Sequence, residues 1–384
     1  MLDMDQKFTS RRGYFLCTAG EHLNAAPPFT PASLGRYLDA LHGKPVHAVA
    51  VRPLDGGRQG EKGYGYGIPL RVDYELDGKR RSAVLETVRP GPYGHEHMAD
   101  RAQLLLWAHD AFRRLPRHVA SLDVGAVRGD GELVALGGAQ EFFMLADFIA
   151  GREYADDLLR MRSSGEASAP DEARADALCD YLVEIHRVAS PDAGLYVRRI
   201  RELVGHGECI FGVVDSYPQE GTVSEKTLQD IESRCLRWRW QLKRRTHRLR
   251  QVHGDFHPWN ILFRDGVDFT VLDRSRGEWG DPADDVACLT MNYLFFSLQR
   301  AGCLEGAFER LFLRFWERYL ERSGDREMLA VIAPFYAFRA LVMASPLWYP
   351  SLAEPLRQKI LNFALNVLDS PGFDPAKANA YCGA

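Results

Sequence analysis

The segment that decides the fold reads VHGDFHPWNILF at Val252–Phe263, and TVLD follows it and ends at Asp273. A further stretch, GDPADD, occupies Gly280–Asp285. Asp255 and Asn260 lie in one tight loop, and two short strand-like stretches around an Asp-Gly turn come next. A hairpin of this length returns the chain to the loop from which it started. We therefore expect Asp255, Asn260 and Asp273 to meet at one place.

A trio of this kind suits phosphoryl transfer from a nucleotide to a hydroxyl group. In that reaction the protein positions the nucleophile and neutralises charge on the moving phosphoryl group, and it does little covalent chemistry. One carboxylate faces the acceptor hydroxyl and takes its proton. An amide oxygen and a second carboxylate hold magnesium, a hard cation that prefers oxygen ligands. Asp255, Asn260 and Asp273 supply these groups.

The pattern HGDxHxxN, a later aspartate and then GDPxxD resembles the catalytic core of the aminoglycoside phosphotransferase and choline kinase superfamily. The resemblance implies the protein-kinase-like fold of that superfamily, with Asp255 as catalytic base and Asn260 and Asp273 as magnesium ligands. It also implies that Asp285 holds the catalytic loop in place. Three further polar residues of the motif are expected to shape the loop and not to react: His253, His257 and Asp281.

The order of the predicted elements agrees with such a fold. Strand patterns dominate before Gly151, and helical patterns dominate after it. The predicted fold class is α+β, a two-lobed protein-kinase-like fold with a small antiparallel sheet in the N-lobe and a mostly helical C-lobe. The predicted division has an N-terminal helical extension at 1–45, a nucleotide-binding N-lobe at 46–150 and a C-lobe at 151–384, with the catalytic loop at 252–273.

The individual elements follow from hydrophobic periodicity and turn signals. A hairpin signal at Asp77-Gly78 joins two strands, and a second hairpin surrounds Gly129–Gly131. The segment Asp171–Val188 has its apolar residues in helical register. The remaining predictions are helices at Thr30–His42 and His97–Phe112, and strands at Val46–Arg52, Pro69–Glu75, Ser82–Arg89 and Glu141–Ile149.

Two segments of the N-lobe are candidates for nucleotide binding. Gly56–Gly67 reads GGRQGEKGYGYG, and glycines let backbone N–H groups approach phosphates closely. The candidate residues in this tract are Gly60, Lys62, Gly63 and Gly65. The apolar run before Gly151 resembles the segment that leads into the hinge between the lobes of these kinases. The resemblance implies that backbone groups of this segment bind adenine. The candidate residues are Ala146, Asp147, Phe148 and Ile149. The predicted cofactors are ATP or GTP, with Mg2+.

One position departs from the pattern of the superfamily. Kinases of this fold place a basic residue on the third strand to hold the nucleotide phosphates, paired with an acid on the next helix. The strand here reads SAVLETV and places Glu86 at that position, where a carboxylate repels a triphosphate. A reversed pair of Glu86 with Arg101 is one possibility. Another is that a different cation serves the phosphates, and the candidates are Lys62, Arg71, Arg89, Arg274 and Arg276.

The sequence therefore leaves three hypotheses about function. The first is a nucleotide-dependent phosphotransferase that phosphorylates a hydroxyl of a small molecule, with Asp255 as its base. The second follows from Glu86 and is a catalytically degenerate kinase-like protein, which binds a nucleotide or metabolite without phosphoryl transfer. The third uses the same fold for another transfer, such as nucleotidyl transfer, or acts on a protein.

The acceptor and the oligomeric state are not readable from the sequence, because a fold does not choose among hydroxyl compounds. A cationic acceptor would favour an acidic pocket, for which the candidates are Asp156, Asp157 and Glu278. Trp259 and Trp279 lie near the catalytic loop in the sequence, and each either packs in the core or stacks on a substrate.

Composition narrows the class of protein. The 384 residues carry a formal net charge of −4 with acids and bases interspersed, which argues against a nucleic-acid partner. Seven cysteines include no CxxC pair, which argues against a zinc site and favours a reducing compartment. The N-terminus has early acids and no long apolar core, so we expect no signal peptide. The longest uncharged runs are too short to span a bilayer, so we expect a cytoplasmic protein without a membrane partner.

Overall fold

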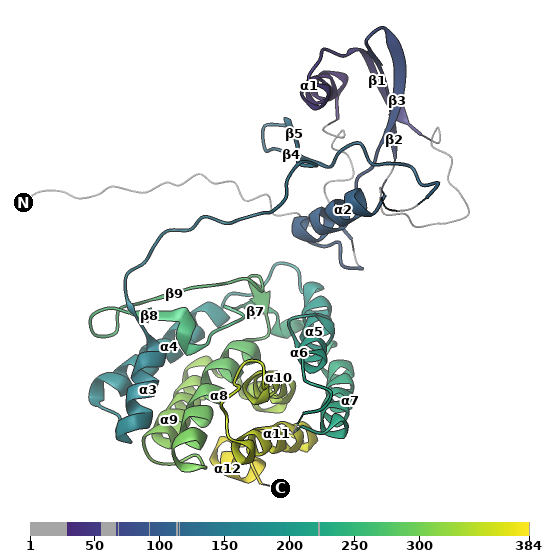
Figure 1. The fold of residues 1–384 in the computed structure, drawn as a ribbon. Coiled ribbons are helices and arrows are strands. Elements are labelled where there is room, and N and C mark those ends of the chain that lie inside the picture. Colours follow the sequence, from purple (N-terminus) through teal and green to yellow (C-terminus); the bar gives the residue numbers. More distant parts are fainter. Residues whose placement is uncertain are drawn as a thin grey trace, which may run out of the picture. The chain divides into compact units, whose positions relative to one another are not determined.

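Figure 1 shows the fold of the protein in a computed structural model. The structure describes residues 29–54, 67, 69–91, 93–112, 114, 116–221 and 223–383. The chain divides into two compact units, residues 1–146 and residues 147–384. Four candidate phosphate-binding residues of the glycine tract lie outside the described residues: Gly60, Lys62, Gly63 and Gly65.

The N-terminal unit has a sheet of three antiparallel strands in the order β1–β2–β3 (Figure 1). The turn between β2 and β3 has positive φ at both central residues, 52° at Asp77 and 70° at Gly78. Such turns match the twist of the strands that they join, and the predicted hairpin is confirmed. The elements of this unit are α1 (Pro31–His42), β1 (His47–Pro53), β2 (Leu70–Leu76), β3 (Lys79–Leu85), α2 (Met98–Phe112), β4 (Gly125–Val127) and β5 (Leu133–Ala135).

Helix α1 begins at a capping box and packs on the sheet. Thr30 Oγ1 accepts from the backbone N–H of Ser33 at 3.1 Å, and Ser33 Oγ accepts from the N–H of Thr30 at 3.0 Å. Leu34 and Leu38 stand on one face of the helix, as their spacing of four residues requires. They form a small core with alternate residues of β2, namely Val72, Tyr74 and Leu76.

The prediction of a strand at Glu141–Ile149 is wrong. The described structure has no regular element there, and no ladder hydrogen bond joins the segment to a neighbouring strand. Its apolar side chains are largely exposed, with 91% exposure for both Leu145 and Phe148. A strand needs a partner for its backbone groups, and apolar composition alone does not supply one.

The C-terminal unit is mostly helical and carries short strands in two small sheets, β6–β8–β9 and β7–β10. None of the helices in the described part of the chain is both long enough and apolar enough to cross a membrane. The helices are α3 (Tyr154–Ser164), α4 (Ala169–His186), α5 (Leu195–Gly205), α6 (Ile210–Asp215), α7 (Glu225–Leu242), α8 (Pro282–Ala301), α9 (Gly306–Ser323), α10 (Ala333–Ala344), α11 (Glu354–Asp369) and α12 (Ala378–Tyr381).

The strands of the C-terminal unit are very short, and the 3-10 turns place several residues of the candidate site. The strands are β6 (Arg152–Glu153), β7 (Arg250–Gln251), β8 (Ile261–Phe263), β9 (Phe269–Val271) and β10 (Trp279–Gly280). The 3-10 turns are η1 (Thr246–Arg248), η2 (Pro258–Asn260), η3 (Arg326–Ala330) and η4 (Pro375–Lys377).

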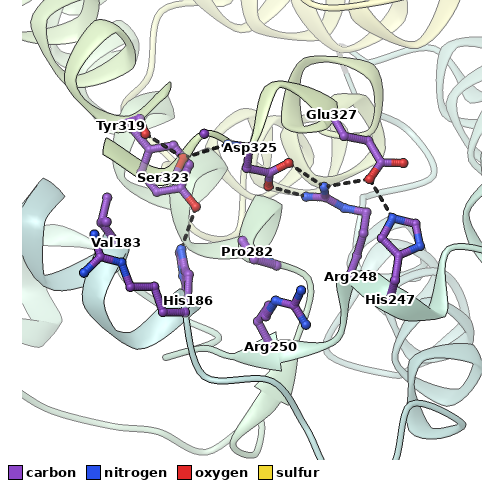
Figure 2. A pocket seen from close by; sticks show the side chains of 12 residues that line it. Val183, His186, His247, Arg248, Arg250, Pro282, Tyr319, Ser323, Asp325 and Glu327 are labelled. Carbon is purple, nitrogen blue, oxygen red and sulfur yellow. Dashed lines mark hydrogen bonds and ion pairs between the residues drawn. The ribbon is translucent and has the colours of Figure 1, made fainter. Parts of the chain in front are cut away.

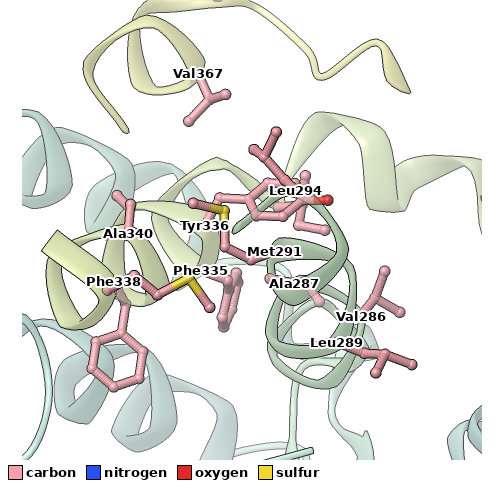
Figure 3. Packing of buried hydrophobic residues seen from close by; sticks show 14 of the residues in the cluster. Val286, Ala287, Leu289, Met291, Leu294, Phe335, Tyr336, Phe338, Ala340 and Val367 are labelled. Carbon is pink, nitrogen blue, oxygen red and sulfur yellow. The ribbon is translucent and has the colours of Figure 1, made fainter. Parts of the chain in front are cut away.

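Helix α8 runs through the core of the C-terminal unit. Every residue from Pro282 to Leu298 is buried, as expected for a helix that is packed on all sides. Figure 3 shows its side chains against those of α10, where Met291 and Leu294 lie near Tyr336, and α11 adds Val367. Because the N-cap and the first turn of α8 contain the GDPADD acids, this packing fixes those acids in space.

Candidate active site

The β8–β9 hairpin brings the catalytic loop and Asp273 together. β8 and β9 pair antiparallel, with Ile261 opposite Val271. One step beyond the paired strands, the N–H of Leu272 donates a hydrogen bond of 2.8 Å to the carbonyl oxygen of Asn260. Asp273 therefore directly follows the residue that is bonded to Asn260. The predicted hairpin connection is confirmed.

Asn260 and Asp273 present oxygen atoms of the kind that magnesium prefers. Nδ2 of Asn260 donates to the carbonyl oxygen of Asp255 at 3.1 Å, which leaves the side-chain oxygen of Asn260 for a cation. Asp273 is exposed and has a φ of 54°, a left-handed conformation that is strained for a residue other than glycine. Magnesium is usually held by one or two protein groups together with phosphates and waters. The two residues therefore fit such an ion.

Asp285 holds the backbone of the catalytic loop in place, as predicted. Its carboxylate is fully buried and accepts from the backbone N–H of His253 at 2.8 Å and of Gly254 at 2.7 Å. His186 Nε2 lies 3.1 Å from the same carboxylate, and Tyr319 Oη lies 2.7 Å from the other ring nitrogen. Burial alone would raise the pKa of Asp285, but His186 and the N–H of His253 outweigh it and lower the pKa. The loop is therefore fixed to α8 by an ionised acid.

Asp281 has a structural role at the start of α8. Its side chain accepts from the N–H of Ala283 at 3.0 Å and so caps the helix. Arg248 donates to both of its oxygens, at 2.8 Å and 2.9 Å, and Tyr196 Oη donates at 2.7 Å. All these groups are buried. Asp281 thus fixes neighbouring segments and does not face a substrate.

The two histidines of the motif also shape the loop, in agreement with the prediction. Nδ1 of His253 accepts from the N–H of Asp255 at 3.3 Å. Nδ1 of His257 accepts from the N–H of Trp259 at 3.2 Å and so caps the turn η2. Both contacts satisfy backbone donors inside the loop, which keeps its conformation defined.

Sequence reasoning missed a central residue of the site, Arg339 of α10. Its Nη1 donates to Oδ1 of Asp255 at 2.5 Å. Its Nη2 donates to Oδ1 of Asp284 at 2.7 Å and to the carbonyl oxygen of Gly254 at 3.1 Å. The arginine is 6% exposed. The available signal was a single arginine inside the apolar helix APFYAFRALVMA, because buried arginines are rare unless they are paired.

The two carboxylates that contact Arg339 have opposite pKa shifts. Burial raises the pKa of Asp255, but the charge of Arg339, followed by those of Arg276 and His257, more than compensates, and the net pKa is lowered. For Asp284 burial is the dominant cause, and the pKa is raised despite Arg339 and Arg276. Asp255 is therefore ionised and able to accept a hydrogen bond from a hydroxyl group.

The residues at the expected phosphate-binding position do not form the pair that we considered. Glu86 follows β3 and is exposed. Arg101 donates to the carbonyl oxygen of His95 at 2.9 Å, and no ion pair joins it to Glu86 in the described structure. Arg71 lies on β2, with Nε 2.8 Å from Oδ1 of Asp73. The possible reversed pair is thus not formed.

The two arginines after Asp273 contact neighbouring groups of the protein: Arg274 contacts backbone carbonyl oxygens and Arg276 contacts an aromatic ring. Arg274 donates to the carbonyl oxygen of Val252 from Nε and Nη2, at 3.0 Å and 2.7 Å, and to that of Glu278 at 3.1 Å. It therefore links the start of the catalytic loop to the segment before α8. The guanidinium of Arg276 lies over the ring of Phe338, with 4.9 Å to the ring centroid.

The candidate acceptor residues have largely structural contacts. Asp157 is buried and forms an ion pair with Arg174. Trp259 stacks on an aromatic ring of α8 with 6.2 Å between the centroids. Nε1 of Trp279 donates to Oε1 of Glu278 at 2.7 Å. These contacts favour packing for Trp259 and exclude Asp157 as an open acidic site.

A separate cavity of about 310 Å³ lies beside the groups that anchor the loop (Figure 2). His186, which contacts Asp285, and Arg248, which contacts Asp281, are among its lining residues. Figure 2 shows Arg248 paired with Asp325, and His247 paired with Glu327. Asp255 is not part of its lining. This cavity therefore borders the supports of the loop and not the reacting groups.

Comparison with protein families identifies the class of this chain. Residues 71–322 match the model of the phosphotransferase enzyme family known as APH. The chain belongs to this family. The matched range contains the predicted catalytic loop, its hairpin and the GDPADD acids. Together with the small antiparallel N-terminal sheet and the mostly helical remainder, it confirms the predicted fold class. Comparison with curated proteins gives no match.

Several solved structures are similar to this chain at low sequence identity. A glucosamine kinase in complex with glucosamine, ADP and inorganic phosphate is 18% identical, with a TM-score of 0.37, over 90% of this chain and 82% of that chain. The gentamicin complex of APH(2")-IIa is 13% identical, with a TM-score of 0.34, over 88% and 96%. An ethanolamine kinase from Plasmodium vivax is 13% identical, with a TM-score of 0.31, over 87% and 80%.

Proposed function

We propose that this protein transfers a phosphoryl group from ATP or GTP to a hydroxyl group of a small molecule. The observation that carries the proposal is the constellation of Asp255, Asn260 and Asp273, which one loop and one hairpin bring together. Membership of a phosphotransferase family supports the reaction type. The buried anchor Asp285 supports it further, because it holds the loop in a defined conformation.

In this proposal each residue has one task. Asp255 is ionised and accepts the proton of the attacking hydroxyl group. The side-chain oxygens of Asn260 and Asp273 hold Mg2+, which neutralises charge on the nucleotide phosphates when it is bound. The glycine tract and the backbone of residues 146–149 remain the proposed nucleotide contacts. The small-molecule acceptor is expected to place its hydroxyl group within hydrogen-bond distance of Asp255.

The first test is a thermal-shift titration with ATP, GTP and ADP, each with and without magnesium. A ligand that binds only the folded protein raises the unfolding midpoint. We expect a larger rise with nucleotide and magnesium together than with either alone. No rise with any nucleotide would contradict the proposal, because it would show that the site does not bind a nucleotide.

The second test measures phosphoryl transfer to a panel of hydroxyl compounds by the wild type and by Asp255→Ala. Loss of a general base lowers the rate by about 10²–10⁴-fold. Asp265→Ala is the matched control, since this exposed aspartate lies at the turn of the same hairpin. Unchanged turnover in Asp255→Ala would refute the proposed role of this residue.

These measurements also separate the phosphotransferase from the alternative, a degenerate kinase-like protein. The feature behind that alternative is Glu86, an acid where the superfamily has a basic residue. Magnesium-dependent stabilisation by a nucleotide, without transfer to any acceptor or to water, would support the degenerate form. Transfer that requires Asp255 would exclude it.

A further inference from the structure

We propose that Arg339 is a positioning residue, which orients the carboxylate of Asp255 toward the acceptor hydroxyl. The inference rests on the proposed function, because it assigns a task to Asp255 as the base. The inference adds Arg339 to the proposed site, and this residue lies on α10, a helix outside the sequence motif at Val252–Asp285. Three contacts of one guanidinium group carry it.

The first contact fixes one oxygen of the base and leaves the other available. Nη1 of Arg339 donates to Oδ1 of Asp255 at 2.5 Å. Oδ2 lies 3.7 Å from Nε2 of His257, which is beyond hydrogen-bond distance. A carboxylate that is held at one oxygen by a charged donor has a defined orientation. Oδ2 is therefore the oxygen that accepts a proton from the substrate.

The second contact joins the same arginine to the backbone of the loop. Nη2 donates to the carbonyl oxygen of Gly254 at 3.1 Å. Gly254 has a φ of 87°, and a Cβ atom there would lie 3.3 Å from the side chain of Arg276. Arg339 thus binds the residue before the base as well as the base itself. This pair of contacts fixes the backbone and the side chain of Asp255 together.

The third contact fixes Arg339. Its Nη2 also donates to Oδ1 of Asp284 at 2.7 Å, and Asp284 is buried in the first turn of α8. The guanidinium lies over the ring of Phe338, with 4.7 Å to the ring centroid. A continuous path therefore runs from α8 through Asp284 and Arg339 to Asp255. Because α8 and α10 pack in the core, this path has little freedom to move.

The planar fork of arginine suits this arrangement better than a lysine ammonium. A guanidinium group presents several donors in one plane, so it reaches two carboxylates and a carbonyl group at once. An ammonium group preserves the charge but is a compact centre without that fork. Arg339→Lys therefore tests orientation while it retains a positive charge beside Asp255 and Asp284.

The experiment measures phosphate release from MgATP with water as the acceptor, so it requires no identified substrate. We expect Arg339→Lys in the full chain to lower kcat by about tenfold or more, because small misplacements of reacting groups are costly. The KM for MgATP should stay within about twofold, since ground-state nucleotide binding is not changed. A KM effect without a kcat effect would overturn the inference.

The matched control is Arg357→Lys. Arg357 of α11 is also buried, at 3% exposure, and Nη2 donates to the carbonyl oxygens of Tyr349 and Leu352, both at 3.2 Å. Its described contacts do not include the catalytic loop. We expect Arg357→Lys to lower the unfolding midpoint and to leave kcat unchanged. Equal kcat losses in Arg357→Lys and Arg339→Lys would show that the effect is structural, and would refute positioning.

A double-mutant cycle separates this inference from the proposed function. If Arg339 acts through Asp255, Arg339→Lys causes no further loss of the residual rate in an Asp255→Ala background. A second, equal loss in that background would refute the inference. Full activity of Asp255→Ala would instead refute the proposed function. Loss in Asp255→Ala but none in Arg339→Lys would leave the function intact and overturn the positioning role alone.

A second variant carries the test if Arg339→Lys shows no cooperative unfolding transition. Asp284→Asn preserves the shape of the side chain and weakens the contact that holds Arg339, while Asp255 keeps its own contacts. We expect a lower kcat and an unchanged KM, and no effect in the Asp255→Ala background. Wild-type kcat in a folded Asp284→Asn protein would overturn the inference.

Discussion

Two acids of the molecule differ in how their side chains are held: Asp285 in the C-terminal unit, and Glu86 at the expected phosphate-binding position of the N-terminal unit. Asp285 is fully buried and accepts two backbone hydrogen bonds, with His186 at its other side. Glu86 is exposed at the end of β3, and no hydrogen bond or ion pair of its side chain is recorded within the described ranges. The first region is built before any ligand binds. Among the described residues, the side chain of Glu86 has no comparable support.

The buried charged side chains that differ from Glu86 in this way lie together at the start of α8. In the C-terminal unit, Asp281 and Asp284 form ion pairs with Arg248 and Arg339, and Nε2 of His186 lies 3.1 Å from the carboxylate of Asp285. Buried charges of this kind are costly unless they are paired and hydrogen-bonded. Asp285 holds the backbone of the catalytic loop directly, and Asp284 is linked to Asp255 through Arg339, so the first turn of α8 supports the loop. The following predictions test that difference.

The largest effect is expected for Asp285→Ala. It removes the acceptor of two backbone N–H groups and leaves His186 without its carboxylate. Removing one partner of a buried pair costs about 3–5 kcal/mol. Urea denaturation measures the free energy of unfolding, with the exposed Asp265→Ala as the control. A loss below about 1 kcal/mol would show that the loop does not depend on this anchor.

The next effect is expected for Asp273→Asn, in activity and not in stability. Asparagine tolerates the left-handed conformation as aspartate does, so the backbone should keep its φ of 54°. Loss of the carboxylate should weaken the proposed Mg2+ site and lower kcat by about 10²-fold. The free energy of unfolding should change by less than about 0.5 kcal/mol, because the side chain is exposed. An unchanged kcat at every magnesium concentration would rule out this ligand role.

The signals that could be predicted from the sequence are local ones. The catalytic loop, the turn and the returning strand lie within Val252–Asp273, so their spacing alone predicts that they meet. Arg339 could not be predicted in the same way, since 84 residues separate it from Asp255. Nothing in the periodicity of an apolar helix says which distant acid its one arginine will contact.

The incorrect prediction of a strand at Glu141–Ile149 has a related cause. Its apolar and aromatic residues favour a strand, but strand formation depends on a neighbouring strand elsewhere in the chain. In contrast, the helix predicted at Thr30–His42 forms as α1, because its helical spacing and the capping box at its start are properties of the segment itself. The sequence therefore specifies elements whose signals are self-contained better than elements that need a distant partner.

A smaller effect is expected for Glu86→Lys, which would bring the N-terminal unit closer to the pattern of the superfamily. Replacing a negative by a positive charge near the nucleotide phosphates should tighten MgATP binding by about fivefold, equivalent to about 1 kcal/mol. Salt should reduce the gain, since exposed charges are screened. Asp130→Lys makes the same change in charge at the exposed β4–β5 turn and is the control. Unchanged affinity in a low-salt calorimetric titration would place the phosphates away from this position.

The smallest effect is expected for Leu145→Ser in the segment that does not form a strand. Leu145 is 91% exposed, so replacing it removes little buried apolar surface. The free energy of unfolding should change by less than about 0.5 kcal/mol. Leu289→Ser is the contrasting control, because Leu289 is fully buried in α8 and its loss should cost about 2–5 kcal/mol. Destabilisation by Leu145→Ser close to that of the control would show that Leu145 is buried in the folded protein, against its 91% exposure in the structure.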